Sequence, residues 1–183
     1  EFPKYGGQLR CILRTGKEVH KMQRFLYKKA AQEPVDFPIE LACFGFDLQC
    51  QTDELIMCRK ERNSVTMYAD YRTTIGAGTR EQCNRLRQLQ AAGVQVFLAS
   101  GNPAQPEYLA AGRTGRGGTG ILHAKVCCVG RWLVHGSANF TTSTRCNVEI
   151  GSLIYLSGSG RRMMDSWFAQ LRNRSQPLTL ELI

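Results

Sequence analysis

Two short segments carry residue types that could bind and cleave a phosphate ester. His123 and Lys125 stand two positions apart in "ILHAKVC", so on a strand their side chains share one face. Burying a lysine costs little free energy only beside a counter-charge or a bound anion. The pair therefore predicts an anion-binding site. The segment "GSAN" (136–139) follows. A Gly-Ser turn of this kind offers N–H groups, a hydroxyl and an amide to phosphate oxygens.

Each of these residues can be given a chemical role. His123 is the candidate nucleophile, while Lys125 and Asn139 would hold the phosphate and Ser137 would donate from the turn. Glu149, on the next expected strand, could accept the Nδ1–H of His123 and leave Nε2 free to attack. The set describes cleavage of a phosphodiester through a phosphohistidine, for which we expect neither a metal ion nor a cofactor.

Three further residues are candidates for substrate binding. Arg113 and Arg116 lie in the glycine-rich segment 101–120, which we expect to be a long loop. They could hold a polyanion near His123, although solvated loop charge is an equal alternative. His135 precedes the Gly-Ser turn and could line the site, but an ordinary strand position is the simpler interpretation.

The composition favours a polyanionic partner. The 183 residues carry 24 Lys and Arg against 15 Asp and Glu, a formal charge of +9, which suits nucleic acid or anionic phospholipid. Eight cysteines lack a disulfide or zinc spacing, so we expect reduced thiols and an intracellular protein. No run approaches the roughly 18 apolar residues of a membrane span. The chain opens without Met, which leaves room for an N-terminal anchor or targeting segment and for a mitochondrial or membrane-associated full-length protein.

Alternating apolar runs and amphipathic segments predict an α/β fold: a mixed, largely parallel sheet flanked by helices on both faces. We assign residues 1–16 to an N-terminal extension and 17–183 to one catalytic domain. Strands are expected at 39–46, 64–70, 94–100 and 147–156, with a hairpin over 121–137. Helices are expected at 17–32, 48–62, 79–93 and 159–175.

Several local details follow from the same patterns. Asp47 and Asp70 are expected to cap helices, and His20 to lie on the surface of a basic helix. The apolar faces of the first and last helices are expected to contain Val19, Met22, Phe25, Leu26 and Ala30, and Met163, Met164, Trp167, Phe168 and Leu171, respectively.

The order "HAK", "GSAN" and then Glu149 resembles the phospholipase D superfamily, whose signature is HxKx4D, six residues and GSxN. The likeness extends over about residues 17–172 and is greatest to small members with one motif, of the bacterial endonuclease type and the mitochondrial cardiolipin hydrolase (Zucchini) type. Such members form homodimers with the active site across the interface. The resemblance therefore implies that one His123 attacks phosphorus while the His123 of a second copy protonates the leaving oxygen.

The chain departs from this signature in one place. Gly130 stands where the motif has Asp, and five residues instead of six separate it from Gly136. The simplest interpretation is a one-residue deletion at the hairpin turn. In the fold that Asp sits away from the phosphate, so the resemblance implies a structural role for it. The zinc module of the Zucchini type has no equivalent here.

Three functions remain open at this point. The favoured hypothesis is an endonuclease that cleaves RNA or DNA, preferably single-stranded, because basic residues are spread through the chain. The second is a phospholipase D or cardiolipin hydrolase acting on anionic phospholipid. The third is a catalytically impaired dimer that binds nucleic acid or phosphate.

Overall fold

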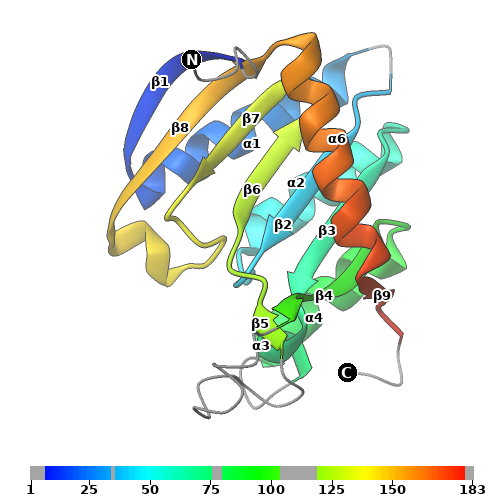
Figure 1. The fold of residues 1–183 in the computed structure, drawn as a ribbon. Helices are drawn as coiled ribbons and strands as arrows, with labels where there is room; N and C mark the ends of the chain where they lie inside the picture. Colours follow the sequence, from blue (N-terminus) through cyan, green and yellow to red (C-terminus); the bar gives the residue numbers. More distant parts are fainter. Residues whose placement is uncertain (1–6, 34–35, 76–79, 104–118, 180–183) are drawn as a thin grey trace.

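The computed structural model describes residues 7–33, 36–75, 80–103 and 119–179, which form a mixed β-sheet with helices on both faces (Figure 1). The strands are β1 (Gly7–Thr15), β2 (Ile39–Cys43), β3 (Val65–Asp70), β4 (Gln95–Pro103), β5 (Thr119–Ile121), β6 (Lys125–Val129), β7 (Trp132–Gly136), β8 (Val148–Leu156) and β9 (Ser175–Pro177). The helices are α1 (Gly16–Gln32), α2 (Gln49–Lys60), α3 (Tyr71–Ile75), α4 (Arg80–Ala91), the 3-10 helix η1 (Ser143–Cys146) and α6 (Gly158–Asn173).

The strand order is β1-β8-β7-β6-β2-β3-β4-β5, with β9 pairing to β4. Strands β2, β3 and β4 run parallel, while the remaining pairings between described strands are antiparallel. The expected mixed α/β class is confirmed. The parallel part is smaller than the sequence indicated, because only the segments that alternate with α2 and α4 require parallel crossovers.

Helices cover the two faces of the sheet unequally. Helices α1, α2 and α4 lie behind the sheet, and α6 crosses in front of its β2-β3-β4 part (Figure 1). One core cluster joins Val19, Tyr27 and Leu55 to the rear face, and the other joins Phe168 and Leu171 to the front face. No described helix lies in front of β1 or of the Val148 end of β8 (Figure 1).

Residues Gly7–Thr15 are a strand, which corrects the expectation of an N-terminal extension. β1 pairs antiparallel with β8, and Leu13 is buried in the rear core. The strand leads directly into α1, whose first turn is capped by Thr15 accepting from the Glu18 N–H at 3.1 Å. The sheet therefore begins before residue 17.

Two apolar residues that we expected on the buried faces of their helices are exposed to solvent. Phe25 is 59% exposed and Met163 is 55% exposed. At about 100° per residue, Phe25 lies about 120° around the helix from Val19, outside the buried stripe. Met163 likewise lies on the side of α6 away from Phe168. Met22, Met164 and Trp167 are partly buried, as expected.

Asp47 does not cap α2, because the N-cap position falls on Leu48, whose side chain accepts no hydrogen bond. The Asp47 carboxylate instead accepts from the N–H and hydroxyl of Thr142 at 2.6 and 2.9 Å. It thereby ties the loop after β2 to the loop after β7.

All eight cysteines are free thiols. Cys127 and Cys128 lie in the rear and front cores respectively, as strand alternation predicts. Burial raises the pKa of Cys58 and of Cys127 to about 12 and that of Cys128 to about 11. Among the described residues, no helix has both the length and the apolar character of a membrane span.

Candidate active site

The predicted site residues gather where the parallel strands end. Lys125, the first residue of β6, pairs with Cys43, the last residue of β2. The loop after β2 is joined to the turn after β7 by hydrogen bonds from Phe140 N–H to Gly45 oxygen at 3.1 Å and from Asp47 N–H to Phe140 oxygen at 3.0 Å. In open α/β sheets, ligands bind at this carboxyl edge.

His123 and Lys125 have different environments. The His123 side chain is exposed, whereas Lys125 is only 7% exposed. The Lys125 ammonium donates to the main-chain oxygen of His123 at 2.9 Å. Burial lowers the pKa of Lys125, a shift partly opposed by Cys43 and Glu149. No described carboxylate forms an ion pair with Lys125, so its charge is available to a bound anion.

Phe44 contacts both His123 and Lys125, and it was not among the site residues expected from the sequence. Its ring meets the His123 ring edge-on, with centroids 5.0 Å apart, and the Lys125 ammonium lies 5.4 Å from the Phe44 centroid. This geometry allows a cation–π contribution. The signal in the sequence is its position, because Phe44 directly follows the last residue of the buried strand β2, where site residues are common.

Asp70 anchors the segment that leads into His123. Its carboxylate accepts from the Thr73 N–H at 2.9 Å, which confirms the expected helix cap. The other oxygen accepts from the Leu122 N–H at 2.7 Å, a contact between residues 52 positions apart. Asp70 is 1% exposed, and its two bonds fix the position of the residue before His123.

The Gly-Ser turn is held against β8. A Cβ on Gly136 would collide with the main-chain oxygen of Ile150, so the motif needs glycine here. The Ser137 N–H donates to that same oxygen at 2.9 Å, and the Ser137 hydroxyl accepts from the Ile150 N–H at 3.0 Å. The hydroxyl also donates to the Glu149 carboxylate, whose second oxygen accepts from the Asn147 amide at 3.2 Å.

Glu149 thus lies beside the site but does not contact His123 within one chain. Its described hydrogen bonds go to Ser137 and Asn147, while its charge acts on Lys125. The orienting role of Glu149 toward His123 stays a prediction.

His20 is buried, which corrects its expected surface position. It is 4% exposed, and its Nε2 lies 2.7 Å from the main-chain oxygen of Asn139. Because a carbonyl only accepts, Nε2 carries the hydrogen. Burial lowers the pKa of His20. The spacing of His20 from the buried residues Val19, Gln23 and Tyr27 places it on the inner stripe of α1, a signal that the sequence contained.

Two buried polar atoms beside this bond have no partner among the described residues: Nδ1 of His20 and Oδ1 of Asn139. Buried polar atoms are normally hydrogen-bonded, and the exceptions are often functional. Among the described residues, the hydrogen bond to Asn139 involves its main-chain oxygen. Its side-chain amide is therefore free to bind a ligand.

The other candidates are not brought to this site. His135 pairs with Val126, whose side chain faces the front of the sheet. Lys125 faces the rear, so His135 and Lys125 lie on opposite faces. Arg113 and Arg116 lie outside the described residues. In the described ranges, no group of three or more His, Cys, Asp or Glu side chains could hold a metal ion.

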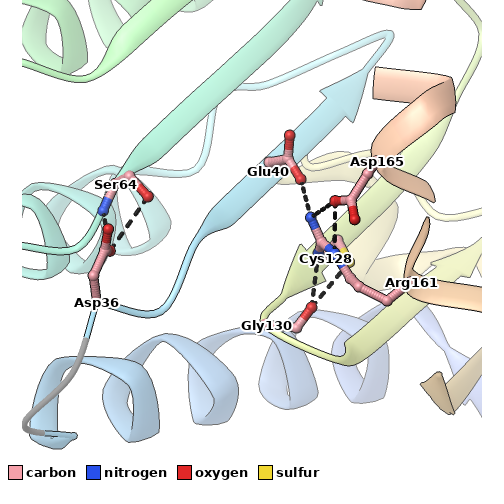
Figure 2. Close-up of polar contacts among 7 residues, drawn as sticks. All are labelled: Asp36, Glu40, Ser64, Cys128, Gly130, Arg161 and Asp165. Carbon is pink, nitrogen blue, oxygen red and sulfur yellow. Dashed lines mark hydrogen bonds and ion pairs between the residues drawn. The ribbon is translucent and has the colours of Figure 1, made fainter. Parts of the chain in front are cut away.

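The hairpin turn that lacks the motif Asp lies at the far end of β6 from Lys125. Gly130 has a φ of +54°, and its oxygen accepts from Arg161 of α6 at 2.7 Å. Figure 2 shows Arg161 between this oxygen, the Cys128 thiol, Glu40 of β2 and Asp165. Arg161 therefore binds the turn, the sheet and α6 together without a carboxylate in the turn.

The sheet, with polar groups gathered at the carboxyl ends of its parallel strands, defines an α/β protein whose candidate site suits an anion. The family described as "Cardiolipin synthase, PLD-like domain" matches residues 39–172. This protein belongs to that phospholipase D-like family. No curated protein matches the chain by sequence.

Solved structures share the fold at low sequence identity. NucT from Helicobacter pylori is 13% identical with a TM-score of 0.73, covering 92% of this chain and 98% of its own. Nuc from Salmonella typhimurium, a phospholipase D family member, is 16% identical with a TM-score of 0.68, covering 92% and 97%. Phosphatidylserine synthase from Haemophilus influenzae is 14% identical with a TM-score of 0.61, covering 91% of this chain and 38% of its own.

Proposed function

We propose that this protein is a metal-independent phosphodiesterase that cleaves nucleic acid, single-stranded by preference, through a phosphohistidine at His123. The observation that carries the proposal is the buried Lys125 ammonium beside the exposed His123 imidazole. A buried charge without a described carboxylate partner favours a bound anion. A phosphodiester supplies that anion and places phosphorus within reach of the imidazole.

The proposed reaction has two steps. Nε2 of His123 attacks phosphorus and forms an N–P bond, while the bond to the leaving oxygen breaks and that oxygen takes a proton from a second imidazole. Water then attacks the phosphohistidine and gives its proton to the second imidazole, which releases a phosphate monoester and restores His123. Lys125 and Asn139 stabilise the charge on the non-bridging oxygens.

A second copy of the chain would supply the second imidazole. Support comes from Val148 and Ile150, which flank Glu149 and are 98% and 64% exposed on the uncovered front of the sheet. Ile12 of the neighbouring β1 is also exposed. Exposed apolar residues grouped on one side of a sheet often mark an interaction surface. These residues lie at the Val148 end of β8, on the face opposite to the Glu149 and Lys125 side chains, so a two-fold interface there would adjoin the site around the edge of the sheet.

Nucleic acid is the favoured substrate because the chain carries a charge of +9 and resembles the Nuc structures in fold. Anionic phospholipid is the second candidate, favoured by the family description and by the likeness to phosphatidylserine synthase. The free thiols favour an intracellular compartment.

The central experiment compares the parent protein with His123→Ala, Lys125→Met and the surface control Lys60→Met. Each is incubated in EDTA with labelled single-stranded RNA, single-stranded DNA and cardiolipin vesicles. We expect the parent and the control to cleave nucleic acid, and the site variants to lose roughly a thousandfold or more in rate. Loss of cleavage in EDTA, or full activity of His123→Ala, would overturn the mechanism. Turnover of cardiolipin alone would assign the lipid substrate, and binding without turnover would assign a binding module.

The dimer is tested separately by mass measurement in solution. We expect a dimer for the parent, and a monomer with little activity for Ile150→Lys. Phe25→Lys is the matched control, because Phe25 is similarly exposed but lies on α1. A fully active monomeric parent would exclude the second imidazole.

A further inference from the structure

A cavity of about 380 Å³ opens beside His123 on the side of α6. It lies between β4 and β5 on one side and the C-terminal half of α6 on the other. Polar and aromatic groups in its wall include Ser100, Asn102, His123, Trp167, Gln170 and Arg174. Its size lies in the range of small-ligand sites, and none of the phosphate-binding roles assigned above uses its α6 wall.

The aromatic part of the wall is held in place by the core. Trp167 is partly buried and meets the Phe168 ring edge-on, with centroids 4.9 Å apart. Phe168 is 1% exposed and stacks on Tyr68. The indole therefore presents a flat surface that does not have to be ordered when a ligand binds.

The polar part of the wall can both donate and accept hydrogen bonds. Gln170 is an exposed amide on α6, and Asn102 is an amide at the end of β4. The Arg174 guanidinium donates to the Asn102 side-chain oxygen, which orients that amide. A planar heterocycle with donors and acceptors on its edge matches such a wall, whereas an acyl chain would leave these groups unpaired.

We propose that this cavity binds a nucleobase of the substrate next to the scissile phosphate. The base stacks on Trp167, and Gln170 and Asn102 contact its edge, while the phosphate occupies the Lys125 and Asn139 site. This inference rests on the proposed phosphodiesterase function and names the structural feature that would select nucleic acid.

The test compares ligands with and without a base by titration calorimetry. AMP and UMP should bind the parent protein about tenfold more tightly than ribose 5-phosphate, as expected for stacking of one base on an aromatic side chain. Trp167→Leu should bring that ratio close to one, and Trp167→Phe should retain most of it. Trp132→Leu is the matched control, because Trp132 lies in the cavity at the hairpin turn, and should keep the ratio.

Gln170→Ala keeps the test informative if Trp167→Leu fails to fold, since Gln170 is exposed. It should lower the ratio by a different factor for AMP than for UMP. Equal affinity of the parent for nucleotides and ribose 5-phosphate would overturn the proposal. So would a ratio that survives in Gln170→Ala and in a folded Trp167→Leu variant.

A base-free substrate separates the two proposals. Hydrolysis of methyl p-nitrophenyl phosphate by the parent but not by His123→Ala tests the phosphodiesterase alone. Hydrolysis without discrimination of the base would overturn only the base site. Discrimination without hydrolysis would overturn only the proposed catalysis.

Discussion

The Nε2 of His20 donates a hydrogen bond to the main-chain oxygen of Asn139 at 2.7 Å, across 119 positions of sequence. Helix α1 therefore supports the turn that is expected to hold phosphate. The imidazole is neutral in this arrangement, because a proton on its buried Nδ1 would find no acceptor among the described residues.

The burial of His20 makes the stability of the fold sensitive to mild acid. Burial lowers the pKa of His20 from 6.5, so below that value the unfolded chain takes up a proton that the folded protein resists. The contribution of His20 to stability is present above pH 6.5 and is lost as the pH falls toward the lowered value. We expect the free energy of unfolding to fall by up to about 1.4 kcal/mol per pH unit from this group, and His20→Gln to reduce the slope. Urea unfolding from pH 5 to 7.5 measures it; an unchanged slope would contradict the assignment.

Asp70→Asn tests the anchor before His123. In the parent protein each carboxylate oxygen of Asp70 accepts one hydrogen bond, from Thr73 or from Leu122. The amide in the variant would have a single oxygen and could therefore keep only one of these two bonds. We expect a loss of about 1–3 kcal/mol in unfolding free energy and a lower turnover rate, because His123 would be less well placed. Asp53→Asn, an exposed change on α2, is the control. Parent-like stability and turnover in Asp70→Asn would show that the two bonds contribute little.

Arg161→Ala tests whether the hairpin turn is structural. The change removes the partner of the half-buried Glu40, whose pKa is already raised by burial. We expect a loss of about 2 kcal/mol in unfolding free energy and unchanged cleavage well below the melting temperature. The exposed Arg162→Ala should leave both unchanged. A folded Arg161→Ala variant that cannot cleave would instead connect the turn to the site.

The buried thiols predict a loss of stability in alkali. Because burial raises the pKa of Cys127 from 9.0 to about 12, the folded state retains a proton that the unfolded chain loses above pH 9. This contribution is full below pH 9 and is lost as the pH rises toward 12. Each such thiol should lower the free energy of unfolding by about 1.4 kcal/mol at pH 10. Denaturant unfolding at pH 7.5 and 10 measures this; Cys127→Ala should reduce the difference, and the exposed Cys146→Ala should not.

Alternation within short segments predicted which side chains share a face. Within β6, Lys125 lies on the same side as Cys127 of the rear core, while Val126 and Cys128 contact the front core. His123 precedes the strand and lines the cavity beside α6, so the alternation of β6 does not fix its direction. The partners that complete the site come from distant segments. Phe44, Asp70 and His20 reach it through tertiary packing, which a local period does not specify.

β1 was missed for a different physical reason. It is an edge strand with mostly exposed side chains, and its pairing with β8 shifts register between Leu9 and Cys11 and again between Leu13 and Thr15. Each irregularity breaks the period of two by which a strand is recognised in sequence.

The pairing of β1 with β8 extends the sheet beyond the range that matches the family. The residues that match the family, 39–172, lack both β1 and α1. A chain cut to that range would uncover the rear core where Val19, Leu26 and Tyr27 now pack, and would expose β8 as a long open edge. The range that matches the family is therefore shorter than the packed structure, because β1 and α1 before Ile39 complete the sheet and the rear core that support the candidate site.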